Sequence, residues 1–221
     1  MADHVPYELH YRKRTIPKEE RSMQSIAIDR EYGSGGREVA RILSEKLGIP
    51  FYDGNLLSMA ARERGINIGT MELYDEKGVG SILHDFALMG NAAYGGTINQ
   101  APFEAYSAMS GLIQVLAKRS PCIFLGRCAG HILKNEAKVP YLHVFIYASD
   151  MQQRIRRAIE VDGIERDKVE SYIRKKDNQR RNYNKFFTQE EWGARKNYDL
   201  LINTSSFGYE RAADLILNSM G

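Results

Sequence analysis

The stretch that decides the fold is SIAIDREYGSGGREVARILSEKLG, Ser25–Gly48. It opens with a short apolar run that contains β-branched residues and ends at Arg30, and a glycine-rich loop follows at once. Behind the loop, apolar residues recur at helical spacing, namely Val39, Ile42, Leu43 and Leu47. Gly48 is placed to end that helix. The sequence therefore predicts a strand, a glycine loop and a helix in direct succession.

The rest of the chain continues the alternation of short apolar runs and helical patterns. Further strands are predicted at 49–53, 122–127, 141–149 and 198–205. Helices are predicted over 55–64, from 102 onward, over 128–134, through much of 150–196 and at the C-terminus. Buried apolar strands that alternate with helices are typical of a parallel sheet covered on both faces. We therefore expect an α/β fold.

Composition narrows the classes of protein that fit. The chain has 221 residues with 43% hydrophobic and 27% charged side chains, which is enough for one soluble domain with an inserted lid. Its two cysteines indicate a reducing compartment, so we expect a cytoplasmic protein. No apolar run approaches the roughly 18 residues that span a bilayer, so no membrane contact is expected. Residues 1–23 are polar and are predicted to form a disordered or poorly ordered extension.

The loop Gly33–Arg37 has the chemistry of a phosphate site. Glycines allow backbone N–H groups to turn inward, and the helix behind them adds the positive end of its dipole. The full P-loop pattern G-x-x-x-x-G-K-[ST] is not met, because no lysine follows Gly35 or Gly36. Arg37 is the nearest cation and is the expected substitute, with a forked donor in place of a point charge. The alternative is a glycine turn that only allows close packing of strand and helix.

Several motifs together resemble the cytidylate kinase-like family, a branch of the nucleoside monophosphate kinases within the P-loop phosphotransferases. The resemblance runs from about Ser25 to the C-terminus. Its most specific pieces are IDREYGSGGREVA, LGIPFYD, FLGRCAGHIL, a helix with Asp177, Arg180, Arg181 and Tyr183, and the ending YDLLINTS. The resemblance implies a P-loop NTPase-like, three-layer αβα fold with a five-stranded parallel sheet and a helical lid insertion.

The resemblance also divides the chain. It implies a single kinase-like domain over 24–221, with a core at 24–64, 102–150 and 197–221. An acceptor-binding region is expected at about 53–101 and a helical lid at about 151–196. The segment 154–196 carries 13 Lys and Arg against 8 Asp and Glu, so positive charge is concentrated in that lid.

Site residues follow from the resemblance, position by position. Donor phosphates are expected on Gly33, Ser34, Gly35, Gly36 and Arg37. The acceptor is expected to meet Asp53, Arg127, Asp177 and Tyr183, and the lid to bring Arg154 and Arg157. Catalytic charge stabilisation is expected from Arg37, Arg127, Arg180 and Arg181. The family has Gly-Arg-Asp after the third strand, whereas this chain has Gly126–Arg127–Cys128, so the arginine carries over and the aspartate does not.

The residues themselves support some of these roles and leave others open. Arg127 follows a buried strand at the sheet edge where open α/β sheets bind ligands. Asp177 and Arg181 are spaced i, i+4, so a local ion pair on a solvated helix is the alternative for this basic stretch. Asp53 could simply cap the next helix. No metal ligand is assigned directly; Mg²⁺ is expected to arrive with ATP, with Glu38 as the first candidate to approach it and Glu31 and Asp29 as further acids beside the loop.

The prediction for function is a phosphotransferase that moves the γ-phosphoryl group of ATP to a nucleoside monophosphate, with CMP or dCMP as the expected acceptor. Two alternatives are a kinase of another small metabolite and a non-catalytic nucleotide-binding module. Binding to nucleic acid through the basic lid is the least favoured reading, because no recognisable reader motif is present. Small nucleotides are the expected partners, and the sequence does not fix the oligomeric state.

Overall fold

The computed structural model describes residues 24–65, 67, 69 and 101–220. The predictions for the N-terminal extension at 1–23 and for most of the acceptor-binding region lie outside these residues. Five parallel strands form one sheet in the order β2-β3-β1-β4-β5. They are β1 (Ser25–Arg30), β2 (Phe51–Tyr52), β3 (Ile123–Leu125), β4 (Tyr141–Tyr147) and β5 (Leu200–Asn203). The predicted α/β fold with a five-stranded parallel sheet is confirmed.

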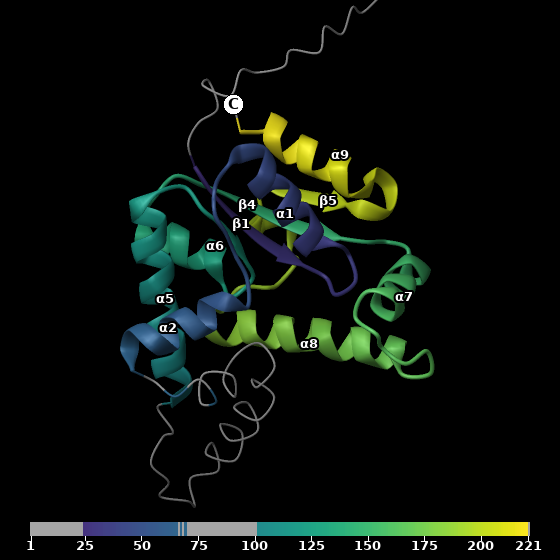
Figure 1. Cartoon of the computed structure of the whole chain (residues 1–221), viewed down its shortest axis with the longest axis horizontal. Helices are drawn as coiled ribbons and strands as arrows, with labels where there is room; N and C mark the ends of the chain where they lie inside the picture. The colour runs from purple at the N-terminus through teal and green to yellow at the C-terminus, as the bar shows by residue number, and fades with distance from the viewer. Residues whose placement is uncertain (1–23, 66, 68, 70–100, 221) are drawn as a thin grey trace, which may run out of the picture.

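The central strand β1 fixes the register of the sheet. Ile26 pairs with Ile123 of β3 on one side and with Leu142 of β4 on the other. All six residues of β1 are buried, which explains why the strand has no alternation of polar and apolar residues. Its carboxyl end, at Arg30, therefore lies in the middle of the sheet edge (Figure 1).

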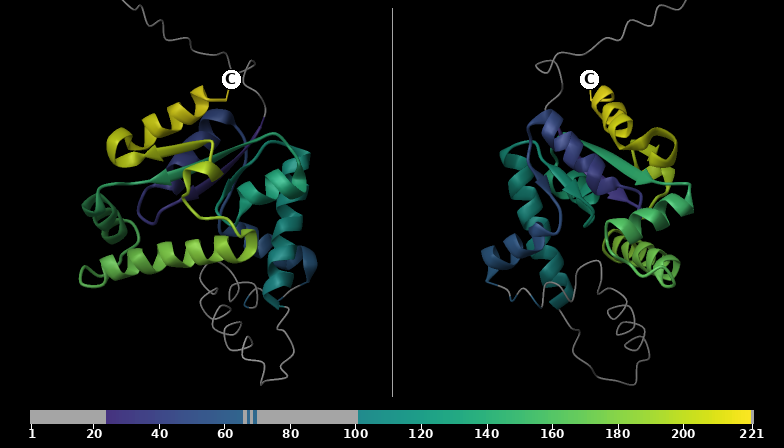
Figure 2. Two further views of the ribbon diagram at one scale, coloured as in Figure 1. Left: turned by 180° about the vertical axis from the view of Figure 1, so that it is seen from behind. Right: turned by 45° about the vertical axis from the view of Figure 1, so that its right-hand side comes forward.

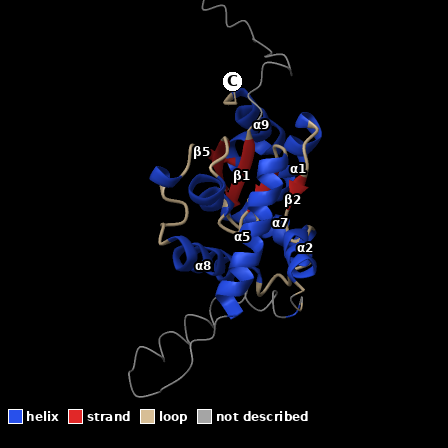
Figure 3. Cartoon of the chain, turned by 90° about the vertical axis from the view of Figure 1, so that its left-hand side faces the viewer, coloured by secondary structure: helices blue, strands red, loops and turns tan. Residues whose placement is uncertain are grey.

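Helices cover both faces of the sheet and make three layers, as Figures 1 and 3 show. One face packs against α1 (Gly36–Leu47) and α9 (Thr204–Asn218) through an apolar core that includes Ile26, Val39 and Ile216. The other face packs against α2 (Asn55–Arg64), α5 (Ala101–Arg119) and α6 (Ala129–Ile132), which is followed by a π-helical turn, η2 (Leu133–Ala137). None of the described helices is long and apolar enough to cross a membrane.

The lid is a pair of helices below the carboxyl edge of the sheet. It comprises α7 (Met151–Glu160) and α8 (Val169–Thr188), and a short 3-10 turn, η3 (Arg195–Asn197), returns the chain to β5. The left view of Figure 2 shows α8 extended below the sheet. Trp192 packs edge-on against Phe145 of β4 with ring centroids 5.0 Å apart, and so fastens the end of the lid to the core.

The predicted helix at Asn55–Arg64 is confirmed at both ends, and Gly48 ends α1 in the left-handed conformation as expected. The second strand is shorter than predicted, because only Phe51 and Tyr52 pair with β3. Pro50 before them has no N–H to donate, although its carbonyl accepts from Ile123 at 2.9 Å. Pro50 can therefore accept a hydrogen bond from the neighbouring strand but cannot donate one.

Candidate active site

The glycine loop lies between the carboxyl end of β1 and the start of α1. Gly35 caps α1 with φ of 78°, a left-handed conformation that glycine adopts without strain. The hydroxyl of Thr204 donates to the Ser34 carbonyl at 2.7 Å, and the Ser34 hydroxyl donates to the Glu31 carbonyl at 2.8 Å. These bonds hold the loop from both sides, so its amides at the helix N-terminus are positioned in advance for an anion.

Two glycines in the loop cannot carry a side chain. At Gly33, with φ of 77°, an added Cβ would lie 2.9 Å from the carbonyl oxygen of Arg154 in the lid. At Gly35 it would lie 2.2 Å from the ring of Tyr209 in α9. The loop is therefore packed backbone-to-backbone against α7 and tightly against α9. The glycines predicted to bind donor phosphate also allow the lid to approach.

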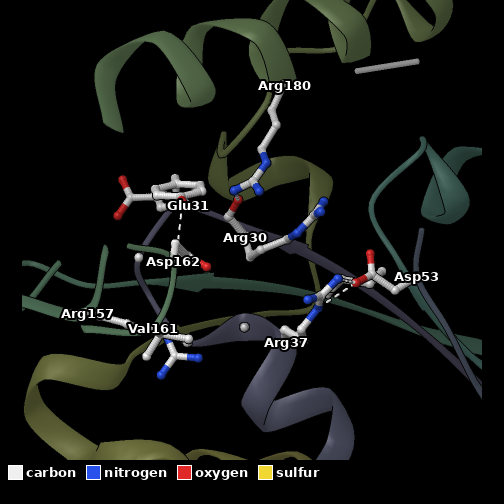
Figure 4. Close-up of a pocket in the computed structure, with 13 residues that line it drawn as sticks. Arg30, Glu31, Arg37, Asp53, Arg157, Val161, Asp162 and Arg180 are labelled. Carbon is white, nitrogen blue, oxygen red and sulfur yellow. Dashed lines mark hydrogen bonds and ion pairs between the residues drawn. The ribbon is translucent and has the colours of Figure 1, made fainter. Parts of the chain in front are cut away.

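A cavity of about 210 Å³ opens beside the loop at the carboxyl edge of the sheet. Its lining comes from the loop, from the ends of β1 and β3, from Asp53 after β2 and from both lid helices. Four arginines and three carboxylates line it: Arg30, Arg37, Arg157 and Arg180, with Glu31, Asp53 and Asp162. Figure 4 shows these side chains around the opening. Such a concentration of guanidinium groups at this edge suits a phosphate-bearing ligand.

Asp53 connects two of the predicted arginines. Both Nε and Nη2 of Arg37 donate to Asp53 Oδ2, and the Nε bond measures 2.6 Å. Arg127 Nη1 lies 3.6 Å from the other oxygen, Asp53 Oδ1. The structure thus brings together the predicted donor cation Arg37, the predicted acceptor cation Arg127 and the predicted acceptor acid between them (Figure 4 shows the Arg37–Asp53 pair).

Arg127 is presented by an unusual turn. Gly126, Arg127 and Cys128 are three consecutive left-handed residues, with φ of 75°, 56° and 57°. The two residues that carry a Cβ are strained in this conformation, and strain of this kind collects at functional sites. Arg127 is also only 6% exposed at the end of β3, next to the cavity rather than in its lining. Cys128, where the family has aspartate, packs against Tyr183 instead of adding charge.

Residues of both lid helices bond to the backbone of Tyr32, just before the glycine loop. Asp177 Oδ1 accepts the Tyr32 backbone N–H at 2.7 Å, and Arg154 Nε donates to the Tyr32 carbonyl at 2.7 Å. Arg154 and Asp177 also form a buried ion pair with each other. The Tyr32 hydroxyl donates to Asp162 at 2.6 Å. Burial is the main cause that raises the pKa of the Tyr32 phenol, and this hydrogen bond raises it further. Both lid helices are therefore bonded to the residue that precedes the glycine loop.

Glu31 takes part in the same contacts between lid and loop. Its carboxylate accepts from the Ala148 N–H at 3.1 Å and lies 3.3 Å from Arg154 Nη1. Burial raises the pKa of Glu31, and the nearby Arg154 partly offsets this effect. Glu31, the residue that follows β1, thus links Ala148 after β4 to Arg154 of α7.

Several predicted residues lie elsewhere than expected. The alternative of a local ion pair between Asp177 and Arg181 is not observed: Asp177 pairs with Arg154, 23 residues away, because its side chain is buried toward α7 and the loop. Arg181 does not line the cavity; it donates to Asn178 at 2.6 Å and lies over the Trp192 ring. Of the two adjacent arginines it is Arg180 that lines the cavity, and its Nη1 donates to the Arg30 carbonyl at 2.9 Å.

Other predicted residues also differ in their surroundings. Tyr183 is buried beside Cys128 and Phe187, so its described contacts are packing contacts, and its role in acceptor binding stays a prediction. Arg157 lines the cavity and lies over the ring of Tyr209, 5.2 Å from the centroid. Glu38 pairs with Arg41 and does not line the cavity.

Sequence reasoning missed Arg30, Tyr32 and Asp162, all of which line the cavity. For Arg30 a signal was available. It ends β1 on the same face as Ile26 and Ile28, so strand alternation predicts that its stem is buried under α1 while its head reaches the sheet edge. Tyr32 and Asp162 gave no comparable signal, because their hydrogen bond joins residues 130 positions apart.

The described residues contain no group of three or more His, Cys, Asp or Glu side chains that could hold a metal ion. The three cavity carboxylates are each bonded to an arginine, a backbone N–H or a phenol. This arrangement fits Mg²⁺ that is carried by substrate phosphates, since Mg²⁺ commonly takes only one or two carboxylates from the protein and completes its shell with phosphates and water.

Comparisons with known proteins agree with this geometry. The sequence profile of the cytidylate kinase-like family matches residues 25–206. No curated protein matches the chain. Among solved structures, an uncharacterized protein from Eubacterium ventriosum is similar with a TM-score of 0.66 and 23% identity, over 89% of this chain and 98% of that one.

A gluconokinase from Sinorhizobium meliloti is similar with a TM-score of 0.50 and 14% identity, over 90% of this chain and 94% of that one. At these identities the likeness shows the fold alone, which is the three-layer αβα fold of P-loop kinases. The match of the family profile covers most of the chain, from the first strand to the start of the last helix. The chain belongs to the cytidylate kinase-like family.

Proposed function

We propose that this protein transfers the γ-phosphoryl group of ATP to a nucleoside monophosphate, with CMP and dCMP as the first acceptors to test. The observation that carries the proposal is the cavity at the carboxyl edge, which the glycine loop lines together with four arginines from β1, α1, α7 and α8. Membership of a kinase-like family supports phosphoryl transfer, and the choice of acceptor rests on the resemblance of the site residues.

The roles follow from position. In this proposal the amides of Gly33–Gly36 and arginines of the cavity lining hold the donor phosphates, and Arg127 with its neighbour Asp53 serves the acceptor. An oxygen of the acceptor phosphate attacks the γ-phosphorus, and the bond to the leaving ADP oxygen breaks. Negative charge spreads over the transferred oxygens in this step, and guanidinium groups are suited to neutralise it.

Mg²⁺ is proposed to enter with ATP, held mainly by its phosphates. Small nucleotides are the proposed partners, and the cytoplasm is the proposed compartment, which the low cysteine content supports. Closure of the lid around Tyr32 would exclude water from the transferred group and so limit wasteful hydrolysis.

The test is a coupled assay of ADP release with Mg·ATP, run with CMP, dCMP, UMP, AMP, GMP and no acceptor. We expect turnover with at least one monophosphate well above the rate without acceptor. Arg127→Gln should lower turnover by about 10²-fold or more, in line with the loss of a charge-stabilising group. Arg41→Gln is the matched control: Arg41 pairs with Glu38 and Glu45 on α1, outside the cavity lining.

The outcomes separate the alternatives. Turnover with another small metabolite but with none of the monophosphates would leave phosphoryl transfer standing and reject the nucleotide acceptor. Tight ATP binding without transfer to any acceptor would reject the enzyme and favour a nucleotide-binding module.

A further inference from the structure

The loop lacks the lysine of the full P-loop pattern, and the position of Arg37 does not supply a replacement over the loop. The Arg37 side chain is 70% exposed, and two of its nitrogens donate to Asp53. Its hydrogen-bonding edge therefore faces the end of β2. This contact takes up the Nε edge of the guanidinium, so Asp53 competes with a phosphate for the two-pronged grip of Arg37.

Arg30 is placed differently. It is the last residue of β1, it is only 9% exposed, and it lines the cavity. In the view of Figure 4 its guanidinium lies between those of Arg180 and Arg37, two other residues of the cavity lining. Its backbone is fixed on two sides, because it pairs with Ile146 of β4 and its carbonyl accepts from Arg180.

Gly36 makes room for this side chain. A Cβ at Gly36 would lie 2.5 Å from Arg30 Cβ and 2.9 Å from Arg30 Cγ. The stem of Arg30 thus crosses directly over the first residue of α1, where the helix N-terminus favours an anion. A phosphate bound at that N-terminus lies within the reach of a guanidinium that is already anchored by its stem.

The carboxylates of the cavity are directed to other groups. Glu31 contacts Arg154 and the Ala148 N–H, Asp53 contacts Arg37 and Arg127, and Asp162 accepts from Tyr32. Arg30 and Arg180 line the same cavity.

We propose that Arg30, and not Arg37, is the cation that binds the donor's β- and γ-phosphates in place of the missing loop lysine. This inference rests on the proposed function only in that both concern the same cavity. The ligand class is a nucleoside triphosphate or another polyphosphate. Arg30 exchanges no proton and forms no covalent bond. Burial of the stem means that little side-chain entropy is lost when the phosphate binds, which favours a tight contact.

The experiment measures binding and needs no acceptor. Titration calorimetry with Mg·ATP, and separately with inorganic tripolyphosphate, is run on the wild type and on Arg30→Gln, Arg30→Lys and Arg37→Gln. Loss of a charge-assisted bond should weaken binding of both probes to Arg30→Gln by about 10- to 100-fold. Arg30→Lys should retain part of the affinity. Arg37→Gln should change the affinity by less than about 3-fold, because solvent screens the charge of this exposed side chain.

Gly36→Ala provides a second route that leaves Arg30 in the chain. The added Cβ should displace the Arg30 stem and weaken ATP binding by about 10-fold or more. In the Arg30→Gln background the same change should weaken ATP binding far less, because glutamine keeps the clashing Cβ and Cγ but has no guanidinium left to be moved off the phosphate. Thermal melting of each variant checks that the fold survives. If Arg30→Gln does not fold, the ATP affinities of Arg30→Lys and Gly36→Ala are compared with that of the wild type instead.

The proposal is overturned by unchanged affinity in Arg30→Gln, by an equal or larger loss in Arg37→Gln, or by equal effects of Gly36→Ala in both backgrounds. Failure of the wild type to bind either probe also overturns it. If the wild type and the variants bind ATP as expected but no acceptor is phosphorylated, the proposed transfer reaction fails while the assignment of Arg30 stands.

Discussion

Replacing Asp177 with asparagine removes the charge at the centre of the contact between lid and loop. The Asp177 carboxylate is 9% exposed, accepts the Tyr32 N–H at 2.7 Å and pairs with the buried Arg154. Removing one partner of a buried ion pair typically costs about 3–5 kcal/mol. The asparagine oxygen still accepts the Tyr32 N–H, and Glu31 still lies 3.3 Å from Arg154, so the lower end of the range applies.

We therefore expect Asp177→Asn to lower the free energy of unfolding by about 3 kcal/mol. For a chain of this length that corresponds to a fall in melting temperature of about 6–12 °C. Urea unfolding followed by circular dichroism measures the first quantity and calorimetry the second. Glu170→Gln, on the exposed side of the same helix, is the control and should change stability by less than about 0.5 kcal/mol.

A double-mutant cycle with Arg154→Met isolates the pair. If the two side chains act together, the double variant should be less destabilised than the sum of the single variants by about 1 kcal/mol or more. A loss of less than about 1 kcal/mol in Asp177→Asn would refute the reasoning, because that size is typical of an exposed ion pair.

Three further predictions follow from the same contacts. Gly33→Ala should cost about 2 kcal/mol or more in unfolding experiments, because its φ of 77° and the Arg154 carbonyl both exclude a Cβ; stability equal to the wild type would contradict the packing. Since burial raises the folded-state pKa of Glu31 above 4.5, the folded chain holds that proton to higher pH than the unfolded chain. The stability of the wild type relative to Glu31→Gln should therefore fall as pH rises above about 4, and an opposite slope would contradict the assignment. Arg180→Gln should lower phosphoryl transfer far more than Arg181→Gln in the ADP-release assay, and equal losses would contradict their placement.

Much of the fold was predictable because its signals are local. The unbroken apolar run before the glycine loop and the helical spacing after it fix β1 and α1. The apolar run that leads to Gly126–Arg127 predicted Arg127 at the sheet edge, and although β3 already ends at Leu125, Arg127 lies next to the cavity. The same kind of signal was present at Arg30 but was obscured by the adjacent loop.

The contacts that close the lid were not predictable from local pattern. Asp177 has a cation four residues away on its own helix, yet it pairs with Arg154 on the preceding helix. The choice depends on how α7 and α8 pack against Tyr32, which is a tertiary contact between segments about 120–145 positions apart. Arg37 likewise followed the glycines in the expected place, but its orientation toward Asp53 depends on where the second strand ends.

The most direct test of the central claim is a crystal structure with a non-hydrolysable ATP analogue and CMP bound together. The account predicts the β- and γ-phosphates against the amides of Gly35 and Gly36, with the guanidinium groups of Arg30 and Arg180 on them and the acceptor phosphate toward Arg127. Phosphates that bind outside this cavity, while the loop holds no anion, would contradict it.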